Sequence, residues 1–264
     1  MTDEPAHHHP VSASPRAGGL RWLGHSTVLV ELDGVRLLTD PVLSSRVGPI
    51  VRIGAPAPAA LDIGEVDGVL LSHLHADHAD LRTLRAVPRS GPIVAPAGAG
   101  AWLRTRGLSP VNEVTAGDEV GVGSLTVTAV PAEHDGRRWP LGPAPSPIGF
   151  LLRGSRSIYF AGDTDLFDGM RALRGSVDVA LLPVWGWGRD VGAGHLDPQR
   201  AATAVALLQP TVVIPIHWGT FALPRVIRPA TDPARPARAF ARLVASGSPG
   251  VEVRVLAPGG ATGL

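Results

Sequence analysis

Cysteine and lysine are both absent from this 264-residue sequence. Without cysteine the chain has no thiolate to bind a metal ion or an iron–sulfur cluster, so a metal site would have to use nitrogen and oxygen ligands. The same absence is compatible with an oxidising or a reducing compartment. Without lysine every basic side chain is an arginine. We interpret this, together with 32 glycines and 26 prolines, mainly as a bias of genomic composition, although arginine also suits bidentate phosphate binding.

The sequence also lacks an excess of charge of either sign and lacks long apolar runs. Its 24 basic and 23 acidic residues give a formal net charge of +1, so no global field favours a polyanion. No stretch is long enough to cross a bilayer, and residues 1–19 contain no apolar core of a signal peptide. We therefore expect a cytoplasmic protein. Residues 1–19, including the tract His7-His8-His9, are predicted to be a disordered, solvated tail.

Apolar patterning predicts a mixed α/β fold. Hydrophobic residues make up 44% of the chain, enough to bury a substantial core, and we expect residues 20–264 to form one domain. The Asp33-Gly34 dipeptide predicts a hairpin. Strands are expected at Leu20–Leu23, Thr27–Leu32, Val35–Thr39, Val69–Leu71, Ile93–Ala95, Leu125–Val130, Ile148–Leu152, Ser157–Phe160, Val179–Leu182, Val212–Ile216 and Val251–Leu256. Helices are expected near Asp80–Ala86, Ala99–Arg106, Pro198–Leu208 and Pro236–Ala245.

Two proline-rich stretches, Val42–Ile63 and Gly136–Pro147, predict long loops without secondary structure of their own. Such loops often cover a functional site, so substrate selection is one interpretation. Compositional bias is an equally good explanation of their residues.

The most informative motif is His73-Leu74-His75-Ala76-Asp77-His78, which follows the apolar run Val69–Leu71. A buried strand that runs into a tight loop can direct alternate side chains towards one point, as a metal site requires. His73 and His75 can share one ion, while Asp77 and His78 turn towards a second. Neutral imidazoles and carboxylates in this pattern predict a metal centre.

Three further candidate ligands, His134, Asp163 and His217, each stand just beyond an apolar run that predicts a strand. Strands would carry all three side chains to the same rim as the first motif. The repeated placement is a second, independent indication of one metal centre.

With these residues in view, the sequence resembles the metallo-β-lactamase superfamily from Leu20 to about Pro258. It is similar to the branch of N-acyl-phosphatidylethanolamine phospholipase D-like enzymes and ascorbate-6-phosphate lactonase-like proteins. The segments that carry this resemblance are Trp22–Thr27, Leu38–Val42, Ala161–Thr164 and Gly194–Pro198. The resemblance implies a four-layer αββα sandwich of two similar halves, with metals at one edge.

The resemblance also implies a ligand scheme for two divalent ions. One ion would be held by His73, His75 and His134, the other by Asp77, His78 and His217, and Asp163 would bridge them. Zinc is the first expectation, with manganese or iron as alternatives. Two cations about 3.5–4 Å apart would lower the pKa of a bridging water and polarise the substrate. The predicted reaction is hydrolysis by a metal-bridging hydroxide, and the missing cysteine ligand argues against β-lactamase activity.

Asp77 and His195 are the predicted catalytic residues. Asp77 would ligate a metal and orient the nucleophile. By resemblance His195 would face the substrate and bind a phosphate oxygen or protonate a leaving group, although a plain loop histidine is the alternative. Next to it, Asp197-Pro198 predicts the start of a helix, with the carboxylate as N-cap.

Several other residues have two interpretations. For His25 a hydrogen bond that supports the site or the fold is favoured over ligation, and Asp40 either orients a metal-binding histidine or caps a turn. Three tryptophans could line an apolar pocket or pack in the core: Trp185, Trp187 and Trp218. Three arginines could clamp an anion or lie in solvent: Arg137, Arg138 and Arg189.

The expected substrate is a small or lipid-like phosphodiester, a phosphorylated lactone or a related ester. A nuclease-type phosphodiesterase is disfavoured because the chain has no basic-aromatic surface run. A diiron redox protein would need an electron carrier, and a non-catalytic metal-binding sensor would be marked by loss of Asp77. The sequence leaves the oligomeric state open.

Overall fold

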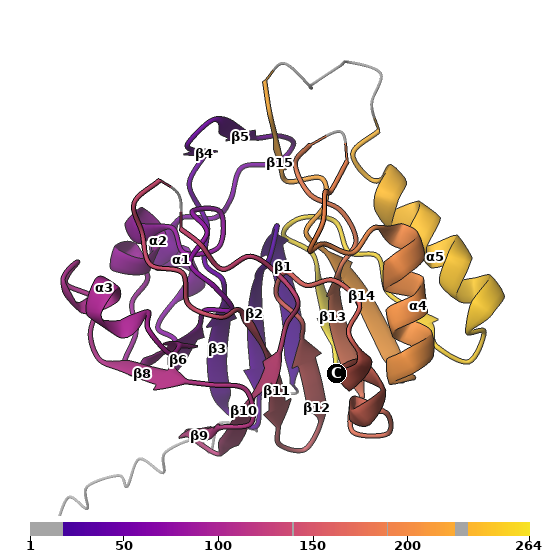
Figure 1. Ribbon diagram of the computed structural model, residues 1–264, viewed down its shortest axis with the longest axis horizontal. Helices are drawn as coiled ribbons and strands as arrows, with labels where there is room; N and C mark the ends of the chain where they lie inside the picture. Colours follow the sequence, from indigo (N-terminus) through magenta and orange to yellow (C-terminus); the bar gives the residue numbers. More distant parts are fainter. Residues whose placement is uncertain (1–17, 139, 189, 225–231) are drawn as a thin grey trace, which may run out of the picture.

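The computed structural model describes residues 18–138, 140–188, 190–224 and 232–264. The expected tail lies outside the described residues, apart from Gly18 and Gly19, and Arg189 lies outside them too. Figure 1 shows two β-sheets side by side, with α1, α2 and α3 flanking one and α4 and α5 flanking the other.

The first sheet has seven strands in the order β17-β1-β2-β3-β6-β7-β8. Strands β17, β1, β2 and β3 are antiparallel neighbours, and β3, β6, β7 and β8 are parallel. The predicted hairpin at Asp33-Gly34 joins β2 to β3, with φ of 51° and 83° at the two turn residues. The bounds are β1 Gly19–Gly24, β2 Thr27–Leu32, β3 Val35–Thr39, β6 Gly68–Leu70, β7 Ile93–Pro96, β8 Val111–Val114 and β17 Ala261–Gly263.

The second sheet also has seven strands, in the order β16-β14-β13-β12-β11-β10-β9. Strands β9 to β12 form an antiparallel meander, and β12, β13, β14 and β16 are parallel. The bounds are β9 Glu119–Val122, β10 Leu125–Pro131, β11 Ile148–Arg153, β12 Ser157–Phe160, β13 Val179–Pro183, β14 Val212–Ile216 and β16 Glu252–Val253.

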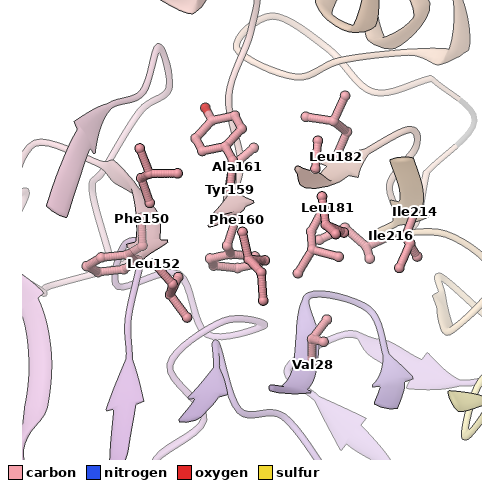
Figure 2. Packing of buried hydrophobic residues seen from close by; sticks show 14 of the residues in the cluster. Val28, Phe150, Leu152, Tyr159, Phe160, Ala161, Leu181, Leu182, Ile214 and Ile216 are labelled. Atoms are coloured by element: carbon pink, nitrogen blue, oxygen red, sulfur yellow. The ribbon is translucent and has the colours of Figure 1, made fainter. Parts of the chain in front are cut away.

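The main hydrophobic core lies between the two sheets. Side chains alternate across a strand, so in β2 Val28 and Val30 join this core while Leu29 joins the cluster under the first group of helices. Figure 2 shows Phe150 and Phe160 of the second sheet packed together, with Val28 of the first sheet nearby. Burial of both faces explains why the strands of the sequence read as nearly continuous apolar runs.

The outer layers are helical. Leu84 of α2 (Leu81–Ala86) and Leu103 of α3 (Gly100–Arg104) pack in the cluster on the first sheet, where α1 (Ala60–Ile63) also contributes Ile63. The second sheet is covered by α4 (Pro198–Leu208) and α5 (Arg235–Gly247), with the short 3-10 helix η1 (Asp168–Leu173) beside α4. These four layers confirm the expected αββα sandwich. Among the described residues, no helix combines the length and apolarity needed to span a bilayer.

The predicted start of α4 is confirmed. The Asp197 carboxylate accepts a hydrogen bond of 2.8 Å from the Arg200 N–H, and Pro198 occupies the first turn. A carboxylate at this position satisfies one of the N–H groups that the first turn of a helix leaves unpaired.

A third, three-stranded sheet of order β15-β5-β4 lies above the sandwich edge in Figure 1. Its strands are β4 Arg46–Val47, β5 Ile50–Arg52 and β15 Phe221–Ala222. The prediction that Val42–Ile63 has no secondary structure is therefore wrong, since β4, β5 and α1 fall within it. The strands are too short to show periodicity, and β5 pairs with a segment distant in sequence.

The strand expected at Val251–Leu256 is shorter in the structure, where β16 contains only Glu252 and Val253. Val213 of β14 accepts a bond from the Arg254 N–H, so the next residue of β14 to face β16 is Pro215. Proline has no N–H to continue the ladder. The Pro215 carbonyl instead accepts a bond of 2.9 Å from the indole of Trp218.

Candidate metal centre

The motif from His73 to His78 occupies the loop between β6 and α2. The His75 carbonyl accepts hydrogen bonds from the N–H groups of His78 at 3.1 Å and Ala79 at 2.8 Å, which closes a single helical turn. The turn brings side chains that are two to five residues apart onto one side of the loop. The β6 strand delivers this loop to the sheet edge as the sequence predicted.

The first cluster contains His73, His75 and His134, the last from the segment after β10. His75 Nδ1 lies 3.2 Å from His134 Nε2, and one nitrogen from each of the three rings lies within 4.8 Å of the others. Two nitrogens that bind one zinc ion tetrahedrally at about 2.0–2.1 Å are themselves about 3.3 Å apart. The observed separation fits a shared ion.

The second cluster contains His78, His217 and Asp163. The two Nε2 atoms of His78 and His217 lie 3.2 Å apart. Asp163 Oδ2 lies 3.1 Å from His78 Nε2, and Asp163 Oδ1 lies 3.2 Å from His217 Nε2. Asp163 also groups with His134 of the first cluster, so its carboxylate lies between the two sets of imidazoles.

The outward nitrogens of three imidazoles are held by protein acceptors. Nδ1 of His78 contacts Asp40 Oδ2 at 2.8 Å, Nδ1 of His134 contacts the Gly194 carbonyl at 2.8 Å, and Nδ1 of His217 contacts the Trp185 carbonyl at 2.5 Å. Carboxylate and carbonyl oxygens can only accept, so each Nδ1 carries the proton. Nε2 of each ring therefore points into the centre and offers its lone pair when the ring is neutral, which is the arrangement that metal-binding histidines adopt.

A serine extends the same arrangement to His73. Ser72 Oγ donates to Asp40 Oδ2 at 2.5 Å and lies 2.9 Å from His73 Nδ1. Because the single hydroxyl proton goes to Asp40, His73 Nδ1 is the donor in the second contact. Ser72 was absent from the predicted site, although a hydroxyl residue directly before His73 at a strand end was a usable signal.

Two buried polar atoms in the centre lack a hydrogen-bond partner among the described residues. They are His73 Nε2 and Asp163 Oδ1; the second approaches His217 only in the ion-pair contact given above. Unpaired buried polar atoms are costly and call for an unseen partner. Several acceptors that face one another across about 3 Å cannot satisfy each other, but a cation satisfies all of them. The donor set therefore fits a divalent metal.

The local electrostatics fit the same conclusion. Burial lowers the pKa of His73 well below its ordinary value and that of His217 to about 3, which favours the neutral, metal-binding form. Burial opposes ionisation of Asp163, but the imidazoles of His217 and His78 outweigh it and hold the pKa of Asp163 well below the usual range. Burial also opposes charge on His78, yet Asp163 and Asp40 raise its pKa well above normal. The centre attracts positive charge.

Asp77 lies at the open side of the second cluster. Its Oδ2 atom lies 3.1 Å from His25 Nε2 and 2.9 Å from Trp187 Nε1. A group of possible ligand atoms within 4.8 Å of one another includes Asp77 and His25 together with His78 and His217. The structure thus brings together all seven residues of the predicted ligand scheme.

His195 lies between the metal cluster and solvent. Its Nε2 atom is 3.6 Å from Asp163 Oδ2, and its ring contacts that of His134 edge-on at 4.6 Å between centroids. Its Nδ1 atom contacts the Ala193 carbonyl at 3.1 Å. Burial opposes protonation, but the Asp163 carboxylate more than compensates and raises the pKa of His195. The side chain is half-buried, so one edge can meet a substrate.

Backbone strain is concentrated at this centre. Five non-glycine residues of the described part have a positive φ, and three of them belong to the site: His25 at 52°, Asp40 at 31° and His217 at 64°. Each such residue costs about 1 kcal/mol or more and persists only where its surroundings enforce it. Here the His217 N–H donates to the His25 carbonyl at 2.9 Å, and the His25 N–H donates to Thr220 Oγ1 at 2.7 Å.

The tryptophan and arginine candidates differ in where their side chains lie. Trp218 is buried and packs against Trp22 with ring centroids 4.9 Å apart and the rings tilted by 38°, as the core interpretation predicts. Arg137 is exposed. Arg138 fits neither of its interpretations, because its Nη1 atom donates to the carbonyls of Leu74 at 2.6 Å and Ala79 at 3.1 Å. It ties together the two ends of the ligand loop.

A hollow at the opposite ends of the first-sheet strands is lined in part by Asp33 and Asp67. Asp33 accepts bonds from the hydroxyl and the N–H of Ser155, and Asp67 accepts one from the Arg36 N–H. These carboxylates already have partners, so the chemistry of the molecule is concentrated at the histidine edge.

The family model described as the β-lactamase superfamily domain matches residues 35–218. The chain belongs to the metallo-β-lactamase superfamily. A metal-dependent hydrolase of Caldivirga maquilingensis is 32% identical over 247 residues, which cover 92% of this chain and 96% of that protein.

In other relatives the match with this chain covers a smaller share of the relative's length. Proteins of Mycobacterium tuberculosis and Mycobacterium bovis are 35% identical over 218 residues, and the chain spans 59% of their length. A Caenorhabditis elegans protein named N-acyl-phosphatidylethanolamine-hydrolyzing phospholipase D 1 is 29% identical over 233 residues, covering 76% of this chain and 63% of that protein.

Solved structures share the fold. A metallo hydrolase from Ignicoccus hospitalis has a TM-score of 0.70 at 24% identity, covering 94% of this chain and 98% of its own. A diiron β-hydroxylase from Streptomyces venezuelae also has a TM-score of 0.70, at 23% identity, covering 96% of this chain and 55% of its own. At the level of the family, the predicted membership of the metallo-β-lactamase superfamily is confirmed. The fold by itself does not select the reaction.

Proposed function

We propose that the chain is a binuclear metal-dependent hydrolase that cleaves a phosphodiester, a phosphorylated lactone or a related ester. The observation that carries this proposal is the convergence of imidazole nitrogens and carboxylates at one sheet edge, where His73 Nε2 and Asp163 Oδ1 are buried without a hydrogen-bond partner among the described residues. Buried acceptor atoms without hydrogen-bond partners are costly, and cations bound between them would remove that cost.

The proposed ligands follow the two clusters. His73, His75 and His134 would hold one ion, and Asp77, His78 and His217 would hold the other, with Asp163 between them. A ligand set of nitrogen and oxygen atoms suits zinc, and manganese or iron are the alternatives. Two divalent ions held there would supply an activated water and polarise the bond under attack.

Asp77 is the proposed nucleophile-orienting residue. Its Oδ2 atom already contacts two N–H groups, so Oδ1 is the atom that can face a ligand or an attacking water. Burial opposes its ionisation, but the hydrogen bond from His25 and the neighbouring imidazoles hold the pKa of Asp77 well below normal. Asp77 is therefore ionised, and its carboxylate can ligate a cation or accept a hydrogen bond from an attacking water.

His195 is the proposed proton donor to the leaving group. Its raised pKa keeps a larger fraction protonated near neutral pH, and its half-buried position allows contact with a substrate oxygen. A general acid works best when its pKa is close to the working pH. The imidazolium would also attract an anionic phosphate oxygen.

A small or lipid-like ester is the proposed substrate class. The Caenorhabditis elegans relative is named for hydrolysis of a phospholipid, which supports a phosphodiester. Partly buried apolar side chains lie next to the ligand loop, among them Ala76, Trp187 and Leu223. They would suit an apolar substituent on the ester.

The test is a comparison of turnover on bis-p-nitrophenyl phosphate and on a panel of lactones. Asp77→Asn should lower kcat/KM by about 100-fold or more, the usual effect of losing a group that positions or transfers a proton. Asp168→Asn, an exposed carboxylate on η1, should leave turnover unchanged. Equal turnover of wild type and Asp77→Asn on every active substrate would contradict the proposal.

A further inference from the structure

Asp77 Oδ2 is saturated by two N–H donors that come from distant parts of the chain. His25 Nε2 lies 3.1 Å away and Trp187 Nε1 lies 2.9 Å away, from residues 52 and 110 positions distant in sequence. An indole nitrogen can only donate, and an ionised carboxylate can only accept, so His25 Nε2 also carries a proton here. This tautomer excludes His25 Nε2 as a metal ligand while the contact persists.

Two carboxylates near the centre are used differently. Asp40 accepts the Ser72 N–H at Oδ1, and it accepts both Ser72 Oγ and His78 Nδ1 at Oδ2. Both oxygens of Asp40 are therefore engaged. In Asp77 both N–H contacts fall on the same oxygen, which leaves Oδ1 for a metal or an attacking water. The donors thus decide which atom of Asp77 is available.

The His25 donor is held rigidly. Its ring is buried and packs 3.9 Å from that of His217 and edge-on to Phe221 at 5.2 Å between centroids. The backbone N–H of His25 donates to Thr220 Oγ1. The backbone carbonyl of His25 accepts the Trp22 indole N–H at 2.8 Å and the backbone N–H of His217. These contacts enforce the left-handed backbone of His25 and fix the direction of its Nε2–H.

The Trp187 donor is held by the small third sheet. Its side chain packs on the apolar cluster of Val42, Val47, Ile50 and Phe221, and its carbonyl accepts a bond of 3.4 Å from the Leu223 N–H. Phe221, a member of the cluster on which Trp187 packs, also packs on the His25 ring. The apolar cluster of the third sheet therefore supports the indole that reaches Asp77.

We infer that His25 and Trp187 are positioning residues that fix the Asp77 carboxylate and present Oδ1 to the metal centre, with the β15-β5-β4 sheet as their support. The inference rests on the proposed function. Outer hydrogen-bond partners of metal ligands typically change metal affinity or activity by 10- to 100-fold when they are removed. On this inference the indole N–H of Trp187 contributes to activity in addition to the packing of its ring.

Trp187→Phe separates these two contributions, because the ring remains and the N–H is lost. We expect metal-stripped Trp187→Phe to bind Co²⁺ at the second of two sites about 10-fold more weakly than wild type, with an altered visible spectrum of the bound ion. With metal supplied in excess, kcat should fall while KM stays nearly unchanged. Asp168→Asn alters an exposed carboxylate on η1 outside both donors and the third sheet, and it should match wild type in Co²⁺ affinity, spectrum and kcat.

His25 provides a second, independent pair of variants. His25→Gln keeps an amide N–H that can reach Asp77, whereas His25→Leu keeps bulk without a donor. The glutamine variant should retain more Co²⁺ affinity and more of kcat than the leucine variant. Thermal unfolding of the metal-free proteins separates a positioning effect from loss of the fold.

The outcomes are distinguishable from failure of the proposed function. If wild type binds no Co²⁺ and turns over no ester, the proposed function itself fails. If wild type binds two ions and is active, while Trp187→Phe retains wild-type affinity, spectrum and kcat, the positioning role is wrong. Equal losses in His25→Gln and His25→Leu would likewise contradict it, because packing alone would then explain the role of His25.

Discussion

At the residue scale, the centre depends on which imidazole nitrogen carries a proton. Asp40, Gly194 and Trp185 each accept an Nδ1–H and thereby turn Nε2 of a histidine inward. A carboxylate behind a metal-binding histidine also makes that histidine a stronger ligand. Replacing a residue that accepts an Nδ1–H from a candidate ligand should therefore change metal binding, as replacing the ligand itself would.

Asp40→Asn tests this dependence. Asparagine tolerates the positive φ of this position. Its amide has only one oxygen, however, so it cannot replace both Asp40 oxygens, which accept the Ser72 backbone N–H and the His78 Nδ1–H. Metal affinity should fall by about 10- to 100-fold with little change in secondary structure. Titration of stripped protein with Zn²⁺ measures this, with Asp168→Asn as the matched control. Unchanged affinity in Asp40→Asn would show that His78 needs no acceptor.

Metal binding should depend on pH through His78. Burial opposes its protonation, but Asp163 and Asp40 raise its pKa well above the ordinary value, so the metal-free protein keeps a proton on His78 at neutral pH. A metal must displace that proton, so affinity should fall as the pH falls, and uptake should release about one proton per ion at this site. Calorimetry in two buffers of different ionisation enthalpy counts the protons. Affinity that is constant between about pH 6 and pH 8 would contradict this prediction.

Arg138 should stabilise the ligand loop. Its guanidinium donates to the carbonyls of Leu74 and Ala79 and packs over the Trp102 ring at 4.5 Å. Arg138→Leu should lower the free energy of unfolding by about 2 kcal/mol, because carbonyl groups at both ends of the loop lose a charged donor. Denaturant titration measures the loss, and the exposed Arg137→Leu serves as control. Equal stability of the two variants would show that the loop holds its shape alone.

At the element scale, the site is assembled by strand ends. Parallel strands β3, β6, β12 and β14 each end just before a site residue, respectively Asp40, His73, Asp163 and His217. The carboxyl ends of parallel strands share one edge of a sheet, and ligands commonly bind there. Apolar runs followed by His or Asp were therefore enough to predict which residues would meet.

Helix caps should differ in their contribution to stability. Asp80, the N-cap of α2, accepts from the N–H groups of Arg82 and Thr83 and from Ser44 Oγ, whereas Asp197 of α4 accepts from Arg200. Replacement of an N-cap by alanine costs about 0.5–2 kcal/mol. Asp80→Ala should lie near the upper end and Asp197→Ala near the middle, as measured by thermal unfolding. A larger loss of stability in Asp197→Ala than in Asp80→Ala would contradict this ranking of the two caps.

Elements that depend on distant partners could not be predicted from the sequence. The ranges of β12, β14 and α4 match their predictions because each has a clear apolar pattern with boundary residues of its own. Strands β4, β5 and β15 contain two or three residues each, and their pairing joins Arg52 to Phe221. Their formation depends on tertiary packing, which local propensity does not report.

At the scale of the whole molecule, the same distinction applies to the site. The candidate ligand set followed from the family resemblance and from strand order, since each candidate lies in a segment that follows a strand. The contacts of Trp187 with Asp77 and of Arg138 with Leu74 join segments 110 and 64 residues apart. No spacing rule links such pairs, because their geometry is set by loops. The sequence therefore left the role of Trp187 open and predicted the wrong roles for Arg138.

The central claim is that the histidine edge holds two metal ions that hydrolysis requires. The most direct measurement is metal content by elemental analysis of protein purified without chelator, with turnover of bis-p-nitrophenyl phosphate and a lactone panel before and after stripping. The account predicts close to two equivalents per chain, with turnover that is lost on stripping and restored by the metal. Metal-free protein, or bound metal with no turnover on either class of substrate, would contradict it.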